Sequence, residues 1–453
     1  MRDLYQQTFE YATDFLSQIN ELPIQVDDVA RTNLKHLDID LQACGLDASE
    51  VIDELNRWVT PATMKMGSSR FFGFVIGGSY PVSVAANWLG TAWDQNTGLE
   101  KTTPAVAMLE KVSARWLLQI LGLPAESATA FVTGATVANF TALAAARNQV
   151  FANAGWDVEA NGLIGAPDLQ IIISEESHPT VYKSLGMLGL GRNRVTRVPT
   201  DDQGRMDITQ FPKIQDNAIV ITQAGNINSG AFDPIGEICD LLEGENAWVH
   251  VDGAFGLWAM ATEKYQHLGL GLERADSWAT DAHKWLNVPY DSGLAFVKNH
   301  VALKAAMAIT ASYLPSENAG RNPSDYTPEL SRRARGIDVY AVLRHLGSSG
   351  VAELIERCCA CTKRFAELFN DAGFEVMNEV VLNQVVVSFG SERINLAVLD
   401  AVQKDGTCWL GQTIWQDRLV ARISVSNWQT DFTEVDRSFA VIKKMADQVL
   451  KCK

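Results

Sequence analysis

The stretch that decides the fold begins with Ala247-Trp248-Val249-His250-Val251-Asp252, an apolar run that ends on a carboxylate. It continues to Asp276-Ser277-Trp278-Ala279-Thr280-Asp281-Ala282-His283-Lys284, a second apolar run with a lysine just beyond it. Short apolar runs bounded by polar residues predict buried strands. Asp252 and Lys284 are therefore expected just past the ends of two strands.

A carboxylate and a lysine in this arrangement suit one cofactor, pyridoxal phosphate. That cofactor needs a lysine to form its Schiff base and a carboxylate to hold its pyridine nitrogen protonated. Taken singly, Asp252 would be explained as a capping residue and Lys284 as a surface residue. Taken together at two strand ends, they favour the cofactor.

Strands and helices alternate on both sides of this stretch. Apolar runs predict strands at 130–133, 171–173, 218–221, 248–251, 277–280 and 293–297. Helices are expected from 134 to about 148, after His178 and after Pro234. This rhythm predicts an α/β fold with a mostly parallel central sheet and flanking helices. Ligands of such sheets bind beyond the carboxyl ends of the strands, where the candidate residues lie.

The chain is expected to divide into three parts. Residues 1–66 form an N-terminal helical segment for dimer packing, with helices at 1–20 and at 47–58. Residues 67–340 form the large cofactor-binding domain, in which 67–100 begins as a glycine-rich loop and 104–121 is a helix. Residues 341–453 form a small C-terminal α/β domain.

Composition excludes several classes of protein. The chain has 453 residues, of which 47% are hydrophobic and 20% charged, with a formal net charge of -16. This charge disfavours nucleic acid and anionic membranes as partners, and no run of residues is long and apolar enough to span a bilayer. The seven cysteines are odd in number and irregularly spaced, which favours a reducing, cytoplasmic setting. Cys358, Cys359 and Cys361 are interpreted as a packed helix face, and no metal site is predicted.

Two further motifs follow predicted strands. Gly134-Ala135-Thr136 precedes a helix, where free backbone N–H groups and the helix dipole favour an anion, although an ordinary N-cap turn is the alternative. His178 could stack on a flat cofactor ring or be a surface residue at a helix start. The chain contains no HExxH, GxSxG or GxxxxGK[ST] motif, which disfavours zinc proteases, serine hydrolases and P-loop enzymes.

Over residues 65–430 these motifs, in this order, resemble the group II pyridoxal-phosphate-dependent amino-acid decarboxylases. That group includes aromatic amino-acid and glutamate decarboxylases and has the fold type I architecture of the aspartate aminotransferase superfamily. The resemblance implies that the enzyme converts an L-amino acid to its amine and carbon dioxide. It also implies a homodimer with the active site at the subunit interface.

The resemblance also assigns residues to the cofactor. Lys284 matches the Schiff-base lysine, Asp252 the partner of the pyridine nitrogen, and His178 the histidine that stacks on the ring. The full cofactor-binding set that it implies is Ala135, Thr136, His178, Asn226, Asp252, Ala254, Asp281, His283 and Lys284. Asp281 departs from the family, which usually has asparagine at this position, and is closer to sphingosine-phosphate lyase.

Other positions match substrate and loop residues of the family. Arg422 matches the arginine that grips a substrate carboxylate, and Tyr313 matches the loop tyrosine that protonates the substrate carbon after carbon dioxide leaves. Phe74 lies in an apolar loop that favours a neutral side chain. Trp93 belongs to a more polar segment that is expected to reach the pocket of the neighbouring subunit. The apolar loop and the polar segment point to different substrates, so the identity of the amino acid is left open.

Two alternatives remain at this point. The first keeps pyridoxal phosphate but runs an aminotransferase, aldolase or carbon–carbon lyase reaction, because those enzymes share Lys284 and Asp252. The second is a non-catalytic regulator with the same fold. Tyr313 favours decarboxylation over the other reactions of this cofactor. A non-catalytic regulator is disfavoured because it would not need His178 and Arg422 in addition to Lys284 and Asp252.

Overall fold

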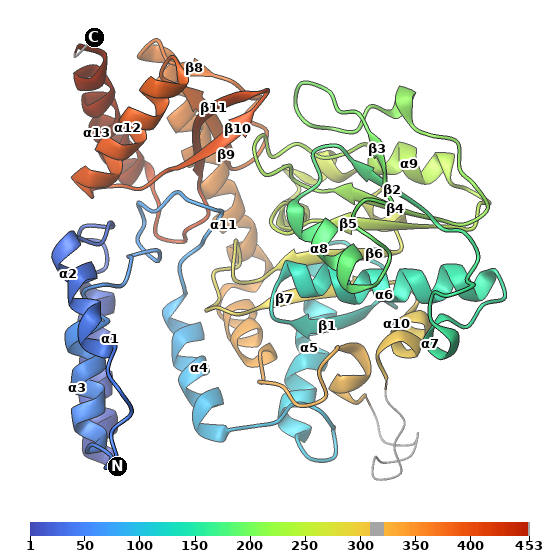
Figure 1. The fold of residues 1–453 in the computed structure, drawn as a ribbon, viewed down its shortest axis with the longest axis horizontal. Coiled ribbons are helices and arrows are strands. Elements are labelled where there is room, and N and C mark those ends of the chain that lie inside the picture. Colours follow the sequence, from blue (N-terminus) through green and yellow to red (C-terminus); the bar gives the residue numbers. More distant parts are fainter. Residues whose placement is uncertain (309–320, 452–453) are drawn as a thin grey trace.

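The computed structural model describes residues 1–308 and 321–451, and its centre is a sheet of seven strands (Figure 1). The strands are β1 (Ala128–Val132), β2 (Gln170–Ser174), β3 (Thr196–Val198), β4 (Ala218–Gln223), β5 (Ala247–Asp252), β6 (Ser277–Asp281) and β7 (Gly293–Val297). They lie in the order β1-β7-β6-β5-β4-β2-β3. The pairs β3–β2, β2–β4, β4–β5 and β5–β6 are parallel. Strand β7 pairs antiparallel with both β6 and β1. The predicted α/β fold with a mostly parallel sheet is confirmed.

The sheet is buried on both faces because its strands are apolar on both sides. Ile219 and Ile221 of β4 pack into a cluster with α6 (Ala135–Asn153), α8 (Pro179–Met187) and α10 (His300–Met307). Val220, between them, belongs to the larger core on the opposite face. Side chains alternate along a strand, so a continuous apolar run fills two cores.

In the described residues, eight more helices precede the C-terminal sheet or lead into it. They are α1 (Arg2–Gln18), α2 (Asp28–Asn33), α3 (Ala48–Trp58), α4 (Pro81–Trp93), α5 (Pro104–Ile120), α7 (Val158–Asn161), α9 (Ile235–Leu241) and α11 (Gly336–Asp371). Short 3₁₀ helices lie at Leu34–Leu37, Ile208–Gln210, Gly256–Ala261, Gln266–Gly269, Leu272–Arg274 and Pro323–Tyr326. None of the described helices combines the length and apolar character needed to cross a membrane.

The structure contains elements that the sequence did not predict, among them α4 and β3. The segment expected as a loop contains α4, which starts with a proline in its first turn. Its apolar residues face several directions, so the sequence shows no helical period. Strand β3 was also not predicted, because only three residues form it and two of them are exposed.

A second sheet lies in the C-terminal part. Its strands are β8 (Glu375–Val376), β9 (Gln384–Ser388), β10 (Gly411–Trp415) and β11 (Arg418–Ser424), in the antiparallel order β10-β11-β9-β8. Helices α12 (Glu392–Asp405) and α13 (Phe432–Lys451) pack on each other beside it (Figure 1). The division at 66 and 340 stays a prediction, and α11 runs through the second of these boundaries.

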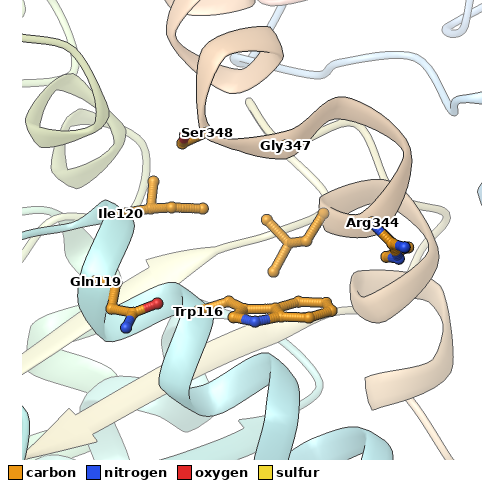
Figure 2. Close-up of a pocket in the computed structure, with 7 residues that line it drawn as sticks. Trp116, Gln119, Ile120, Arg344, Gly347 and Ser348 are labelled. Carbon is orange, nitrogen blue, oxygen red and sulfur yellow. The ribbon is translucent and has the colours of Figure 1, made fainter.

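Helix α11 is kinked at Gly347, whose φ of 63° and ψ of -177° are not helical. Glycine adopts a positive φ without the steric penalty that a side chain brings. The kink leaves a hollow of about 440 Å³ between α5 and α11 (Figure 2). Figure 2 shows Trp116, Gln119 and Ile120 of α5 on one side and Arg344 on the other.

Three cysteines lie on the second half of α11. Cys358, Cys359 and Cys361 are buried, and burial raises the pKa of the Cys358 thiol to about 11 and that of Cys361 to about 12. Such thiols stay protonated at neutral pH and act as small apolar side chains. The interpretation of these residues as a packed helix face is confirmed.

Asn287 joins three distant segments of the chain. Its Oδ1 accepts hydrogen bonds from the backbone N–H groups of Gly78 (2.7 Å) and Trp428 (3.0 Å). Its Nδ2 donates to the carbonyl groups of Trp285 (2.7 Å) and Ser426 (2.9 Å). Its φ is 56°, a left-handed conformation that asparagine tolerates better than most residues. Asn287 therefore fixes the turn that carries the predicted cofactor lysine.

Replacing Asn287 with alanine is expected to lower the free energy of unfolding by about 5 kcal/mol, since its four side-chain hydrogen bonds contribute about 1 kcal/mol each and alanine disfavours this backbone by about 1 kcal/mol more. Urea denaturation measures the change. Asn287→Gly is the matched control: it loses the same hydrogen bonds but accepts the backbone, so it should be less destabilised than Asn287→Ala. An unchanged denaturation midpoint for Asn287→Ala would contradict the role given to this residue.

Candidate active site

A cavity of about 440 Å³ opens at the carboxyl ends of β4, β5 and β6. Its walls include ten of the residues that the sequence singled out, namely Phe74, Ala135, Thr136, His178, Asp252, Ala254, Asp281, His283, Lys284 and Arg422. Asn226 and Trp93 do not line it. Tyr313 lies outside the described residues. The predicted place of the site, past the strand ends, is where this cavity lies.

Lys284 enters the cavity from the turn that follows β6. Its Nζ lies 3.0 Å from Oδ2 of Asp281, and its side chain is 21% exposed. The amine is therefore held in place by a buried carboxylate yet remains accessible from the cavity.

Asp281 explains how an acid fits beside a predicted anion site. Its Oδ1 accepts a hydrogen bond of 2.6 Å from the N–H of Ala135, the first residue of α6. A carboxylate at a helix N-terminus satisfies a free N–H group and interacts favourably with the helix dipole. The N–H of Ala135 is thus occupied, and an incoming phosphate would use the next N–H groups, those of Thr136 and Val137, with the Thr136 hydroxyl.

His283 follows the same turn and points its ring towards this anion site. Its Nδ1 accepts from the N–H of Ser292 (3.0 Å), so a neutral ring carries its proton on Nε2, which lies 3.6 Å from Oδ1 of Asp281. Burial lowers the pKa of His283. The ring of Tyr290 packs against it, with 4.3 Å between the ring centres.

Asp252 is buried at the end of β5. Its Oδ1 accepts from the N–H of Ala254 (3.2 Å), and its Oδ2 accepts from Nδ2 of Asn139 (3.1 Å). Burial raises the pKa of Asp252, and the positive charge of Lys284 and these hydrogen bonds oppose that rise. A cationic group placed against this carboxylate would be strongly stabilised.

His178 caps α8 and presents a neutral ring to the cavity. Its Nδ1 accepts from the N–H of Thr180 (3.3 Å) and lies 2.7 Å from the Thr180 hydroxyl. A ring nitrogen that accepts carries no proton, so the proton of the neutral ring is on Nε2. Burial lowers the pKa of His178, which keeps the ring uncharged at neutral pH.

Arg422 reaches the cavity from β11 of the second sheet. It is 7% exposed, and among the described residues its side chain donates one hydrogen bond, from Nη1 to the carbonyl of Ile227 (3.1 Å). Within residues 1–308 and 321–451, no carboxylate forms an ion pair with it. Burial lowers the pKa of Arg422 to about 10, so the guanidinium remains charged at neutral pH. A buried, uncompensated guanidinium is suited to an anionic ligand.

Phe74 forms an apolar part of the wall in a strained conformation. Phe74 and Val75 have φ values of 55° and 57°, which are unfavourable for residues with side chains, above all for a β-branched one. Stacking holds the loop: the ring centre of Trp409 lies 4.9 Å from that of Phe71 and 5.3 Å from that of Phe74. Strain of this kind persists where the surrounding structure fixes it, often at functional sites.

Gln223 is a wall residue that no sequence motif singled out. It is the partner of Asp252 in the pairing of β4 with β5, and it is 4% exposed. Its buried Nε2 has no hydrogen-bond partner in the described parts of the chain. The β4–β5 register was the signal needed to find it. Asn226, which the sequence favoured, is fully buried, and its Oδ1 accepts from the N–H of Asn228 (2.8 Å).

These residues fit pyridoxal phosphate. The start of α6 offers N–H groups to a phosphate, Asp252 offers a carboxylate to a ring nitrogen, and Lys284 offers an amine to an aldehyde. The unpartnered donor of Gln223 beside Asp252 is the kind of group that a ring oxygen would satisfy.

Comparison with known proteins agrees with this fit. Residues 32–390 match the family model described as the pyridoxal-dependent decarboxylase conserved domain. An aromatic-L-amino-acid decarboxylase of Bacillus atrophaeus is 27% identical, over 99% of this chain and 96% of that protein. An acidic amino acid decarboxylase of Xenopus tropicalis is 29% identical, over 76% of this chain and 69% of that protein.

Among solved structures, Oryza sativa TDC with PLP and tryptamine is similar at a TM-score of 0.89. It is 21% identical, and the match covers 99% of this chain and 97% of the other. That likeness supports the fold. The family match extends over most of the sequence, including the two strand ends that carry Asp252 and Lys284. The chain therefore belongs to the pyridoxal-dependent decarboxylase family.

Proposed function

We propose that this cavity is the active site in which Lys284, Asp252 and Arg422 carry out the decarboxylation of an L-amino acid. The observation that carries the proposal is the meeting of these three side chains in one cavity, from β5, the turn after β6 and β11. A lysine binds the cofactor, a carboxylate sets its protonation, and a guanidinium binds a substrate carboxylate. A non-catalytic regulator would not need all three.

The start of α6 binds the cofactor phosphate in this proposal. Thr136 donates its N–H and hydroxyl, and His283 donates Nε2–H. Asp281 orients this region by capping Ala135 and by holding Lys284. Asp281 thereby affects the cofactor through its neighbours and need not touch the phosphate.

When bound, pyridoxal phosphate supplies an electron sink for the bond that breaks at the substrate α-carbon. Asp252 would hold a proton on the ring nitrogen by charge pairing, and Ala254 would lie against the ring. His178 would stack on the ring with a neutral imidazole, and Gln223 would donate its side-chain N–H to the ring oxygen.

Two residues act on the substrate. Arg422 binds a carboxylate through its fork of N–H donors. Tyr313, outside the described residues, is proposed to return a proton to the α-carbon after carbon dioxide leaves. The proposal for Tyr313 is supported by its match to the loop tyrosine of the family.

We propose a neutral, apolar or aromatic side chain for the substrate. Among the described wall residues, the charged cations are Lys284 and Arg422, and both already have roles. The lowered pKa values of His178 and His283 remove them as cations at neutral pH. No described wall residue then remains to pair with an acidic side chain, whereas Phe74 offers an apolar surface.

The proposal is tested by offering the protein, with pyridoxal phosphate, each common L-amino acid together with ornithine and 2,4-diaminobutyrate. Mass spectrometry should detect an amine lighter by carbon dioxide from one or two neutral substrates. Turnover of glutamate or aspartate alone would overturn the substrate class while leaving the reaction intact. A keto acid as the main product would instead favour the aminotransferase alternative.

Arg422→Met is expected to raise KM about a hundredfold, because a hydrogen-bonded pair with a charged group contributes about 1.5–3 kcal/mol to binding. Steady-state kinetics with the substrate that the mass-spectrometry screen identifies measures this change in KM. Arg418→Met is the matched control: Arg418 lies on the same strand but is exposed and pairs with Glu375. Equal kinetics for the two variants would remove Arg422 from the site.

We also propose a homodimer whose active sites lie at the subunit interface. Helices α1 and α3 bury no residue within the chain and, with α4, lie at one side of the molecule (Figure 1). These helices expose large apolar side chains, namely Tyr5, Phe9, Leu16, Val51, Leu55, Trp88, Leu89 and Trp93. Large apolar side chains exposed on these helices favour a protein partner, and we propose that a second copy covers them and brings Trp93 towards the neighbouring site. Light scattering should give the mass of a dimer.

The cytoplasm is the proposed location. All six cysteines of the described ranges are free thiols, and five of them are buried. Free buried thiols are typical of a reducing compartment.

A further inference from the structure

Five buried polar groups form a continuous row that ends at Asp252. We name it the polar row: Trp248, Ser277, His250, Asn139 and Asp252. Trp248 Nε1 lies 2.8 Å from Ser277 Oγ, which lies 2.8 Å from His250 Nδ1. His250 Nε2 lies 2.9 Å from Asn139 Oδ1, and Asn139 Nδ2 lies 3.1 Å from Asp252 Oδ2. Three members, Asn139, His250 and Ser277, have no exposed surface.

The two ends of the polar row, together with a neutral His250, fix the direction of every hydrogen bond in it. The indole N–H of Trp248 can only donate, and the ionised carboxylate of Asp252 can only accept. Asn139 must therefore turn its NH₂ group to Asp252 and its carbonyl to His250. His250 then donates from Nε2 and accepts at Nδ1, which leaves the hydroxyl of Ser277 to donate to it.

This arrangement needs a neutral His250. A second proton on Nδ1 would reverse the hydrogen bond to Ser277, because His250 would then donate to the hydroxyl oxygen instead of accepting from the hydroxyl. Burial without any charged neighbour lowers the pKa of His250 to about 3, in agreement with a neutral ring. Every donor in the row therefore points towards Asp252, and aligned hydrogen bonds polarise one another in the same sense.

We propose that Asn139 and His250 are positioning residues that keep Asp252 ionised and aimed at the ring nitrogen of the cofactor. Asp252 has lost most of its hydration, and the Asn139 amide replaces part of that loss with a donated hydrogen bond. His250 holds that amide in place, because a rotated amide would turn its NH₂ group against the Nε2–H of His250 and its carbonyl oxygen against the carboxylate. This inference rests on the proposed function.

The test compares the binding of pyridoxal phosphate with that of its 1-deaza analogue, which has carbon in place of the ring nitrogen. Fluorescence titration of the apoprotein gives both dissociation constants without any turnover. The ratio of the two constants reports the interaction between Asp252 and the ring nitrogen. General damage to the site weakens both ligands together and leaves this ratio unchanged.

The variants are His250→Leu and His250→Gln. Leucine removes the group that orients Asn139, so the preference for the natural cofactor should fall about tenfold, as expected when a hydrogen bond to a charged group is lost. Glutamine offers an N–H near the place of Nε2 and should restore most of the preference. Ser277→Ala, which frees the other side of the His250 ring, should lower the ratio as well and serves if the leucine variant does not fold.

The outcomes separate the inference from the proposed function. A wild-type protein that binds both ligands equally would refute the pairing of Asp252 with the ring nitrogen, and with it the proposed function. A clear wild-type preference that is unchanged in His250→Leu and Ser277→Ala would overturn the inference alone. A reduced preference in His250→Leu that glutamine restores would support it.

Discussion

Lys284→Ala is expected to abolish the covalent attachment of pyridoxal phosphate and to lower kcat at least about a thousandfold, the scale of losing a nucleophile that forms a covalent bond with the reacting system. The proposed phosphate site at α6 and the carboxylate of Asp252 remain, so the cofactor should still bind without a covalent bond. Borohydride reduction followed by mass spectrometry of the intact protein measures the attachment. The wild-type protein should gain the mass of one cofactor and the variant none.

Lys264→Ala provides the control for this experiment, because Lys264 is exposed and does not line the cavity. That variant should retain both the attachment and the activity. Added methylamine should partly restore turnover to Lys284→Ala, since a free amine can replace the missing group. Attachment of the cofactor to Lys284→Ala would show that another lysine binds it.

Asp252→Asn should lower kcat by about a hundredfold or more, the effect of losing a preorganised charge at the reacting system. The same change should make the protein without cofactor more stable at neutral pH. Burial raises the pKa of Asp252 above that of the unfolded chain, so its ionised form opposes folding at any pH above the unfolded value. The melting temperature of the protein without cofactor should therefore rise, whereas kcat should fall.

Asp276→Asn is the matched control for this pair of effects. Asp276 precedes β6 at the opposite end of the same strands, its pKa is also raised by burial, and its Oδ2 accepts from the N–H of Val249 (2.8 Å). Its replacement should leave kcat unchanged. If Asp252→Asn retained full activity, the ring nitrogen would not depend on this carboxylate.

Much of the fold could be predicted because its strands are short apolar runs with polar ends. The runs at β4, β5 and β6 place Gln223, Asp252 and Asp281 at the same edge of the sheet. Asp252 and Lys284 stood out as residue types with a known chemical use at such an edge. Helix α4 escaped prediction because its apolar residues do not follow a helical period.

The parts of the site that escaped prediction depend on contacts between distant segments. Gln223 can be recognised as a site residue only when the β4–β5 register places it beside Asp252. Asn139 lies inside α6, where an asparagine gives no signal until that helix packs on β5. The capping role of Asp281 requires the start of α6 to meet the end of β6, which no local pattern reveals.

The fate of the substrate carboxyl group distinguishes decarboxylation from every alternative reaction. A neutral L-amino acid labelled with carbon-13 at that group is incubated with the enzyme and pyridoxal phosphate, and mass spectrometry quantifies all products. We expect labelled carbon dioxide and unlabelled amine in equal amounts. A labelled keto acid, or label retained in any other organic product, would contradict decarboxylation.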